Sequence, residues 1–249
     1  ELHLLKLSES ENMMTGEITR EEQRIALPQL QEPIKALYID VQGNWLFVLN
    51  GRAHMDVFDL RRRTLNGRYE MTADASTEVT ASAQLLGGIS LLIGDSRGGI
   101  AQWFMARDPD DEQRLKFIRG FQLGDAAITQ IAAEERRKGF VALNAAGELG
   151  VFHSTAHRTL LTENVSDSGT AMFALSPRAN RILLEDGQRL LPFSLENEHP
   201  EISWSSLWSK VWYESYSEPK HIWQSTAATV DFEPKMSLAP LTFGTLKAA

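Results

Sequence analysis

The chain has 249 residues, of which 43% are hydrophobic and 23% charged, as in an ordinary soluble globular protein, and no run of 18 apolar residues could span a bilayer. Its formal net charge of −8 disfavours a broad nucleic-acid interface or an anionic-membrane face, because phosphate groups are bound by basic patches. Cysteine is absent, which excludes disulfides, thiolate metal sites and cysteine catalysis but leaves the cellular compartment open.

The chain opens with two strand-like pieces, residues 2–7 and 24–27, which a polar stretch separates. We predict that residues 1–33 are a partial copy of the repeat unit described next, whose other half lies upstream of Glu1. The chain also starts without an initiator Met and without the charged and apolar regions of a signal peptide. We therefore expect a piece that was cut from a longer protein.

A pattern of two apolar strands around a glycine-containing turn recurs four times between residues 34 and 200. The second strand of each unit ends in a large aromatic residue, and these four residues are 45, 49 and 41 positions apart: Phe58, Trp103, Phe152 and Phe193. A period of roughly 40–50 residues with two visible strands is typical of propeller blades.

Each unit also has strands on either side of this pair. An inner strand begins the units at residues 34–39, 79–83, 128–132 and 171–175, and an outer strand follows the aromatic residue at 68–71, 115–120 and 158–162. Four strands per unit make a propeller blade. We therefore predict an all-β, WD40-like β-propeller. It has four visible four-stranded blades, near residues 34–75, 76–123, 124–165 and 166–200, plus the partial blade at 1–33.

The strands and turns of these units fit blades that are stacked on one another. Residues 46–49 and 182–184 are continuously apolar, which suits strands covered on both faces. The glycines supply the positive φ that tight hairpin turns require. The visible units fill four to five blades of a ring that usually has four to eight, so an incomplete ring is compatible with the sequence. Open blade faces and strand edges would favour self-association.

A helical period replaces the strand pattern after Phe193. Five apolar residues fall at i, i+3, i+4, i+7 and i+8, on one face of a helix: Trp204, Leu207, Trp208, Val211 and Trp212. We predict a short amphipathic, Trp-rich helix over residues 201–218, which Pro219 ends. Its tryptophan face has three interpretations: packing against the side of the propeller, a surface for a partner subunit, or a membrane-proximal surface.

The C-terminal residues carry a family resemblance. Residues 208–225 and 231–248 resemble the permease subunit of bacterial phosphate-uptake ABC transporters, in the long variant that has a large periplasmic domain before its membrane core. The motif residues are Trp223, Gln224, Ser225, Glu233, Pro234, Lys235, Phe243, Gly244 and Thr245. In that family the Glu-Pro-Lys and Phe-Gly-Thr-Leu-Lys motifs lie at the approach to the first helix of the core. Residues 225–249 are predicted to be an extended tail, and residues 219–249 would then be a linker to a membrane core.

The resemblance implies a periplasmic domain at the bacterial inner membrane, anchored by segments outside this chain. It also implies partners, namely the phosphate-binding protein, the partner permease and the ATPase subunits. An acidic domain is poorly suited to phosphate capture, so we expect a non-catalytic docking or regulatory module for phosphate import, without a cofactor. One alternative is a free-standing, soluble propeller scaffold for protein interactions. Another is a propeller hydrolase, which the nearly apolar inner strands disfavour.

Three short motifs contain residue types that could form a chemical site. Residues 94–99 resemble the loop around a trypsin-like nucleophile, but the inserted Arg97 breaks its spacing and the segment coincides with a predicted turn. His153 and His157 lack a third ligand, and the acidic residues 108–112 lack the ligand spacing of an EF-hand. The basic residues 61–63 and 136–138 are explained as solvated turns. No catalytic, metal or cofactor site is predicted.

Overall fold

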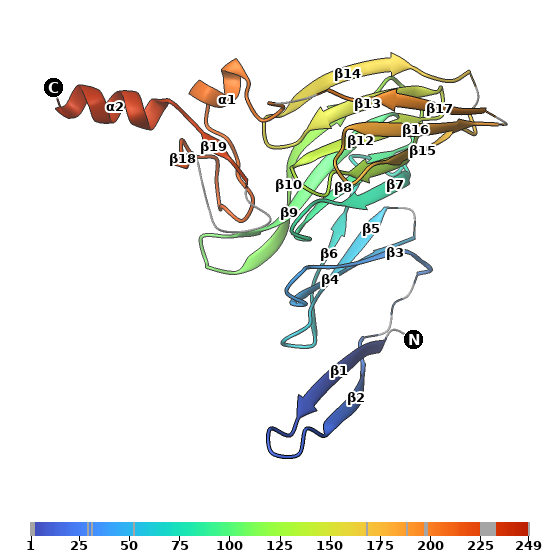
Figure 1. Cartoon of the computed structure of the whole chain (residues 1–249), viewed down its shortest axis with the longest axis vertical. Coiled ribbons are helices and arrows are strands. Elements are labelled where there is room, and N and C mark those ends of the chain that lie inside the picture. The colour runs from blue at the N-terminus through green and yellow to red at the C-terminus, as the bar shows by residue number, and fades with distance from the viewer. Residues whose placement is uncertain are drawn as a thin grey trace.

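The computed structural model describes residues 3–28, 30, 32–51, 53–167, 169–187, 189–196, 199–224 and 233–248. Their strands pair in antiparallel sheets that follow one another along the chain. Figure 1 shows a hairpin of the N-terminal strands at one end of the molecule and the last of the stacked sheets toward the other. We call these stacked sheets blades 1 to 4.

Blades 1 to 3 have four strands each, and their order in space follows the chain. Blade 1 contains β3 (Ile34–Ile39), β4 (Trp45–Asn50), β5 (His54–Asp59) and β6 (Thr64–Glu70). Blade 2 contains β7 (Val79–Gln84), β8 (Ser90–Asp95), β9 (Gly99–Arg107) and β10 (Gln113–Gln122). Blade 3 contains β11 (Ile128–Ala133), β12 (Gly139–Asn144), β13 (Glu148–His153) and β14 (Arg158–Asn164). The predicted all-β architecture of repeated four-stranded sheets is confirmed.

Blade 4 differs from the prediction because it has three strands. These are β15 (Met172–Leu175), β16 (Arg181–Asp186) and β17 (Arg189–Ser194). Among the described residues no strand pairs with the outer edge of β17, and the next element along the chain is a helix. Blade 4 therefore presents a strand edge where the other blades have an outer strand.

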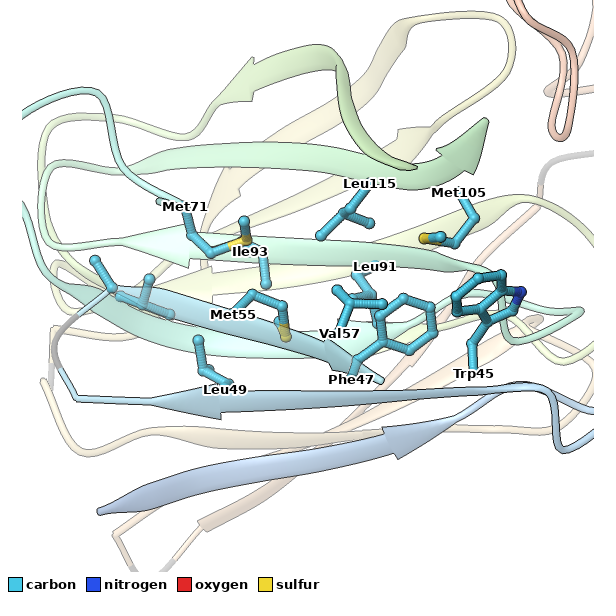
Figure 2. Packing of buried hydrophobic residues seen from close by; sticks show 12 residues of the cluster. Trp45, Phe47, Leu49, Met55, Val57, Met71, Leu91, Ile93, Met105 and Leu115 are labelled. Carbon is cyan, nitrogen blue, oxygen red and sulfur yellow. The ribbon is translucent and has the colours of Figure 1, made fainter. Parts of the chain in front are cut away.

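Apolar clusters between successive blades form the core. Figure 2 shows the cluster between blades 1 and 2, where Phe47 and Val57 of blade 1 face Leu91 and Ile93 of blade 2. Strand β12 illustrates why the central strands of the blades are apolar at successive positions. Its residues alternate between two cores, with Phe140 facing blade 2 and Val141 facing blade 4. We call the face toward the preceding blade the back and the face toward the next blade the front.

The N-terminal hairpin is longer than predicted. Strands β1 (His3–Glu11) and β2 (Ile18–Ala26) pair along nine positions, through the polar stretch that was expected to separate them. Cross-strand ion pairs accommodate these polar residues, as between Arg20 and Glu9 at 2.9 Å. At the base of the hairpin, Leu4 and Leu27 pack into a cluster with Val48 and Phe58 of blade 1. The assignment of residues 1–33 to a partial blade stays a prediction.

The C-terminal segment, residues 199–224 and 233–248, contains α1 (Trp204–Trp208), β18 (Trp223–Gln224), β19 (Lys235–Met236) and α2 (Ala239–Ala248). Two predictions are corrected here. The helix expected over residues 201–218 has five residues, and the tail expected to be extended contains α2. Neither described helix is long and apolar enough to cross a membrane.

Candidate interaction surface

Helix α1 begins at a capping box formed by serines. The Ser203 hydroxyl accepts a hydrogen bond from the backbone N–H of Ser206 (3.0 Å), and the Ser206 hydroxyl accepts one from the backbone N–H of Ser203 (2.9 Å). The helix ends at Ser209, where the backbone becomes extended. Its short length follows from tertiary pairing, because Val211 exchanges both backbone hydrogen bonds with Lys220 in a β-bridge.

The predicted tryptophan face is divided by this early stop. Trp204 and Trp208 are 79% and 42% exposed, and their ring centroids lie 6.3 Å apart. Val211 is buried, and Trp212 packs edge-on against Phe104 of β9 at 6.0 Å. The five residues predicted to share one helix face are therefore divided: Trp204 and Trp208 point to solvent, whereas Val211 and Trp212 pack inward. The half-buried Leu207 lies between the two groups.

Helix α2 extends the outward part of this region. The backbone N–H of Leu238 donates to the carbonyl of Leu207 (2.7 Å), which places the start of α2 beside the end of α1. No residue of α2 is buried, and Lys247 is its one charged residue. We call the exposed apolar residues of the two helices the Trp-α2 surface: Trp204, Trp208, Leu241, Phe243 and Leu246. Figure 1 shows α1 and α2 on the same side of the propeller.

The remaining motif residues have diverse positions. Trp223 and Gln224 form β18 and pair with β19, which contains Lys235. Glu233 is buried and Pro234 is half-buried, whereas Phe243, Gly244 and Thr245 are exposed on α2. Ser225 lies outside the described residues.

Arg119 of β10 ties the C-terminal segment to the propeller. Its guanidinium donates to the carbonyls of Ser154 and Thr155, in the turn after β13, and to the carbonyl of Trp212. Burial lowers the pKa of Arg119 to about 10, although the nearby Glu233 favours its charged form. Arg119 therefore remains charged near neutral pH and crosslinks three backbone segments.

Glu233 and Glu214 provide the acidic half of this contact. Glu233 accepts a hydrogen bond from the Thr155 hydroxyl and another from the backbone N–H of Glu214 at 2.9 Å. Glu214 lies 2.6 Å from Lys138, whose ammonium also donates to the carbonyl of Leu86. Burial raises the pKa of Glu214, and Lys138 opposes that shift. The turns of blades 2 and 3 are thus joined through the C-terminal segment.

An aromatic pair completes the anchor. Tyr213 is buried, and burial together with Glu233 raises its pKa to about 12. The Lys235 ammonium lies 5.5 Å from the ring centre of Tyr213 and 5.9 Å from that of Tyr216, within cation–π range. These contacts hold β19, and with it the start of α2, against residues 213–216 of the same segment.

Sequence reasoning missed the charged residues of this anchor. Lys138 belongs to the basic run that was explained as a solvated turn, yet its side chain is buried. A signal existed for Arg119, because it interrupts an alternating apolar series in β10 that includes Leu115, Phe117 and Phe121. For Glu214 the surrounding sequence offers no comparable signal.

The motifs weighed for chemistry serve structural purposes. Asp95 accepts hydrogen bonds from the backbone N–H groups of Arg97 and Gly99, which confirms the predicted hairpin turn. His153 is buried and accepts from the N–H of Ala156, and burial lowers its pKa to about 3. His157 bonds the Gly120 carbonyl instead. The described residues contain no group of three potential metal ligands.

A cavity of about 500 Å³ lies beside the anchor, between β10, the turn after β13 and α1. Phe117, His157 and Trp212 contribute to its walls. The guanidinium of Arg119, also on the wall, is already engaged by three carbonyls. The cavity is therefore a largely apolar gap beside the anchor.

Solved structures share this fold. The propeller domain of Cps50 (Swd1) from Myceliophteria thermophila matches with a TM-score of 0.54 and 13% identity, over 70% of this chain and 61% of that chain. Sqt1 from Chaetomium thermophilum matches with a TM-score of 0.52 and 14% identity, over 66% and 43%. Sqt1 bound to the N-terminus of ribosomal protein L10 gives 0.51 and 13%, over 64% and 42%. The fold is thus a WD40-type β-propeller, and the chain spans 42% to 61% of the length of these structures.

No family model matches the chain, and neither does any curated protein. The prediction of a phosphate-transporter permease domain is wrong, because the structural matches are WD40 propellers and no permease model matches. The predicted partners, namely the phosphate-binding protein, the partner permease and the ATPase, are wrong for the same reason, as is the inner-membrane, periplasmic localisation. Two of the motif residues, Glu233 and Lys235, instead have roles in the anchor.

Proposed function

We propose that this chain is a non-catalytic β-propeller scaffold that binds a protein partner through the Trp-α2 surface. The observation that carries the proposal is the exposed pair Trp204 and Trp208, held on an anchored segment. Tryptophan contributes a large contact area at little cost in side-chain entropy, and it is enriched among residues that dominate binding energy. Exposed apolar patches of this kind mark interaction sites.

The chemistry of the surface favours an apolar protein partner. Along α1 and α2 the one charged residue is Lys247, so recognition would depend on shape and apolar contact. The anchor supports this role, because Arg119 and Lys138 fix the segment before a partner arrives and thereby reduce the entropy lost on binding. A protein of the same fold, Sqt1, has been solved bound to the N-terminus of ribosomal protein L10, which supports a protein partner for this chain.

The engagement of the buried ionisable groups supports a non-catalytic role. Arg119 is bonded to carbonyls, Lys138 is paired with Glu214, and His153 is neutral at physiological pH because its pKa is about 3. Their arrangement fits structural work.

The test is retention of partners from an extract of the source cells, measured by quantitative mass spectrometry. We expect Trp204→Ala/Trp208→Ala to lose at least about tenfold of a specific partner, since hot-spot tryptophans contribute that much or more. Leu65→Ala is the matched control, because it removes an exposed apolar side chain from blade 1. Thermal melting should be unchanged in both variants. Equal retention by the double variant and the control would disprove the proposed surface.

A further inference from the structure

The outer part of the back of blade 4, at Phe193, is less covered than the same part of blades 1 and 3. The aromatic residues that end the third strands occupy equivalent positions, opposite Leu46, Phe140 and Ile182 on the neighbouring strands. Phe58 and Phe152 are 1% and 0% exposed, whereas Phe193 of blade 4 is 39% exposed.

In blade 2, where the equivalent residue is half-buried, the outer strand contributes part of the cover. There the aromatic residue is Trp103, and Phe117 of the outer strand β10 packs edge-on against it at 5.6 Å. Blade 4 has no described strand that could place a side chain against Phe193 in this way.

A cavity marks the place of the missing strand. It has a volume of about 400 Å³ and is lined mainly by apolar residues of blades 3 and 4, among them Val151, Leu161, Ile182 and Phe193. At the equivalent place between blades 1 and 2, Leu115 of the outer strand packs into the cluster that contains Met55 and Val57. Figure 2 shows Leu115 in that position. The cavity therefore has the location and the lining that suit an apolar side chain from an added strand.

The backbone of β17 is available for pairing. Asp186 and Arg189 are the last paired residues before the turn, so they form the closing hydrogen-bonded pair of a tight hairpin. By alternation, the N–H and C=O groups of residues 190, 192 and 194 point to the free edge. Pro192 lacks an N–H, which is typical of an edge strand. The edge thus offers two donors, from Leu190 and Ser194, and three acceptors.

The chain itself contains a strand that lacks cover. The hairpin of β1 and β2 exposes Leu5 and Leu7, which are 49% and 72% exposed and lie on one side of β1. A two-stranded hairpin is marginally stable alone. Figure 1 shows this hairpin separated from blade 4 by the other blades, so it cannot reach its own β17.

We propose that β1 of a second copy of this chain pairs with the free edge of β17 and inserts Leu5 and Leu7 into the cavity beside Phe193. The exchange is reciprocal, because each copy supplies one donor hairpin and one three-stranded blade that can accept a fourth strand. Two equivalent contacts related by a twofold axis close a dimer. The main-chain pairing is β-augmentation, in which an added strand extends an exposed sheet edge.

The first experiment measures molar mass by light scattering over a range of protein concentrations. We expect the 27.9 kDa chain to give a species of twice that mass. Leu7→Lys should raise the dimer dissociation constant by about tenfold or more, because it replaces a buried leucine with a charge. Met13→Lys adds the same charge at the fully exposed hairpin tip and should leave the constant unchanged. A monomer at every concentration, or equal dissociation constants for the two variants, would refute the exchange.

The second experiment uses the absence of cysteine. Leu5→Cys or Leu7→Cys chains are mixed with Phe193→Cys chains under mild oxidation, and a crosslinked heterodimer is expected with at least one of them. The control replaces Phe193→Cys with Leu65→Cys, an exposed site on blade 1, and should not crosslink. Equal crosslinking to both sites would overturn the proposal. The Trp204→Ala/Trp208→Ala chain should dimerise normally, so loss of partner binding and loss of self-association are distinguishable.

Discussion

Lys138 and Glu214 form a buried ion pair at 2.6 Å, and the two residues belong to parts of the chain 76 positions apart. Lys138 lies in the turn between β11 and β12, and Glu214 lies in the C-terminal segment. Because both side chains are removed from water, each depends on the other for compensation of its charge. The pair therefore makes docking of the C-terminal segment sensitive to a single side chain.

Breaking this pair on one side should be strongly destabilising. Lys138→Met leaves Glu214 buried without its counter-ion, and we expect the free energy of unfolding in urea to fall by about 3–5 kcal/mol. The double variant Lys138→Met/Glu214→Leu should recover part of that loss. Arg107→Met is the control, since it removes a pair with Asp111 that is exposed on both sides, and exposed pairs contribute about 0–1 kcal/mol. Additive losses in the double variant would contradict coupling between Lys138 and Glu214.

Gly147 should not tolerate a side chain. Its φ is +79°, and a Cβ atom there would collide with the carbonyl of Ser166. Gly187 has φ +63° with open space around the same position. We expect Gly187→Ala to cost about 1–2 kcal/mol from backbone strain alone, and Gly147→Ala to cost about 1–3 kcal/mol more from the collision. Equal midpoints in chemical denaturation would show that the turn before β13 adjusts without cost.

Equivalent leucines in blades 2 and 4 should differ sharply in their contribution to stability. Leu92 and Leu183 occupy the same position in their blades, and each lies opposite an alanine, Ala83 or Ala174. Leu92 is fully buried by blade 3, whereas Leu183 is exposed at the open front of blade 4. Leu92→Ala should cost about 2–5 kcal/mol, and Leu183→Ala less than about 1 kcal/mol. Similar losses would mean that the front of blade 4 is covered in solution.

His153 should remain neutral far into the acid range. Its pKa is lowered from 6.5 to about 3, first by burial and then by nearby arginines including Arg137. The unfolded chain takes up this proton near pH 6.5 and the folded chain does not. The burial of neutral His153 therefore does not oppose folding above pH 6.5. As the pH falls below 6.5, the free energy of unfolding decreases, because the unfolded chain binds a proton that the folded chain does not.

Two measurements check this behaviour. In NMR spectra the ring signals of His153 should stay constant between about pH 8 and pH 4. The stability of His153→Gln should also depend less on pH between about pH 7 and pH 5 than that of the natural chain. A ring that titrates near pH 6.5 in the folded protein would contradict the assigned burial.

Regular features of the fold could be predicted from the sequence because they repeat. The inner strand Ile34–Ile39 has the predicted bounds, and the turn at residues 95–99 forms as predicted. These features depend on local backbone preferences and on the alternation of apolar residues, and both can be read from a single sequence.

The C-terminal segment could not be predicted in the same way because its structure depends on distant partners. Helical spacing predicts one helix face from Trp204 to Trp212. In the structure, Arg119 binds the carbonyl of Trp212 and Val211 forms a β-bridge with Lys220, so residues 211–220 are not helical. Lys138 is similar, since nothing beside it indicates an acidic partner 76 residues away. The motif resemblance failed for a related reason: it treated Glu233 and Lys235 as a family signature, whereas Glu233 contacts Thr155 of the propeller and Lys235 contacts Tyr213.

The C-terminal segment also affects how the repeat array unfolds. In a stack where each unit contacts only its neighbours, terminal units have half the contacts and open first. Arg119 of blade 2 and Lys138 of blade 3 both bind the C-terminal segment, which links these two blades by non-covalent contacts in addition to those between their own strands. Blades 2 and 3 should therefore unfold together as one cooperative unit, and blades 1 and 4 should unfold separately before them.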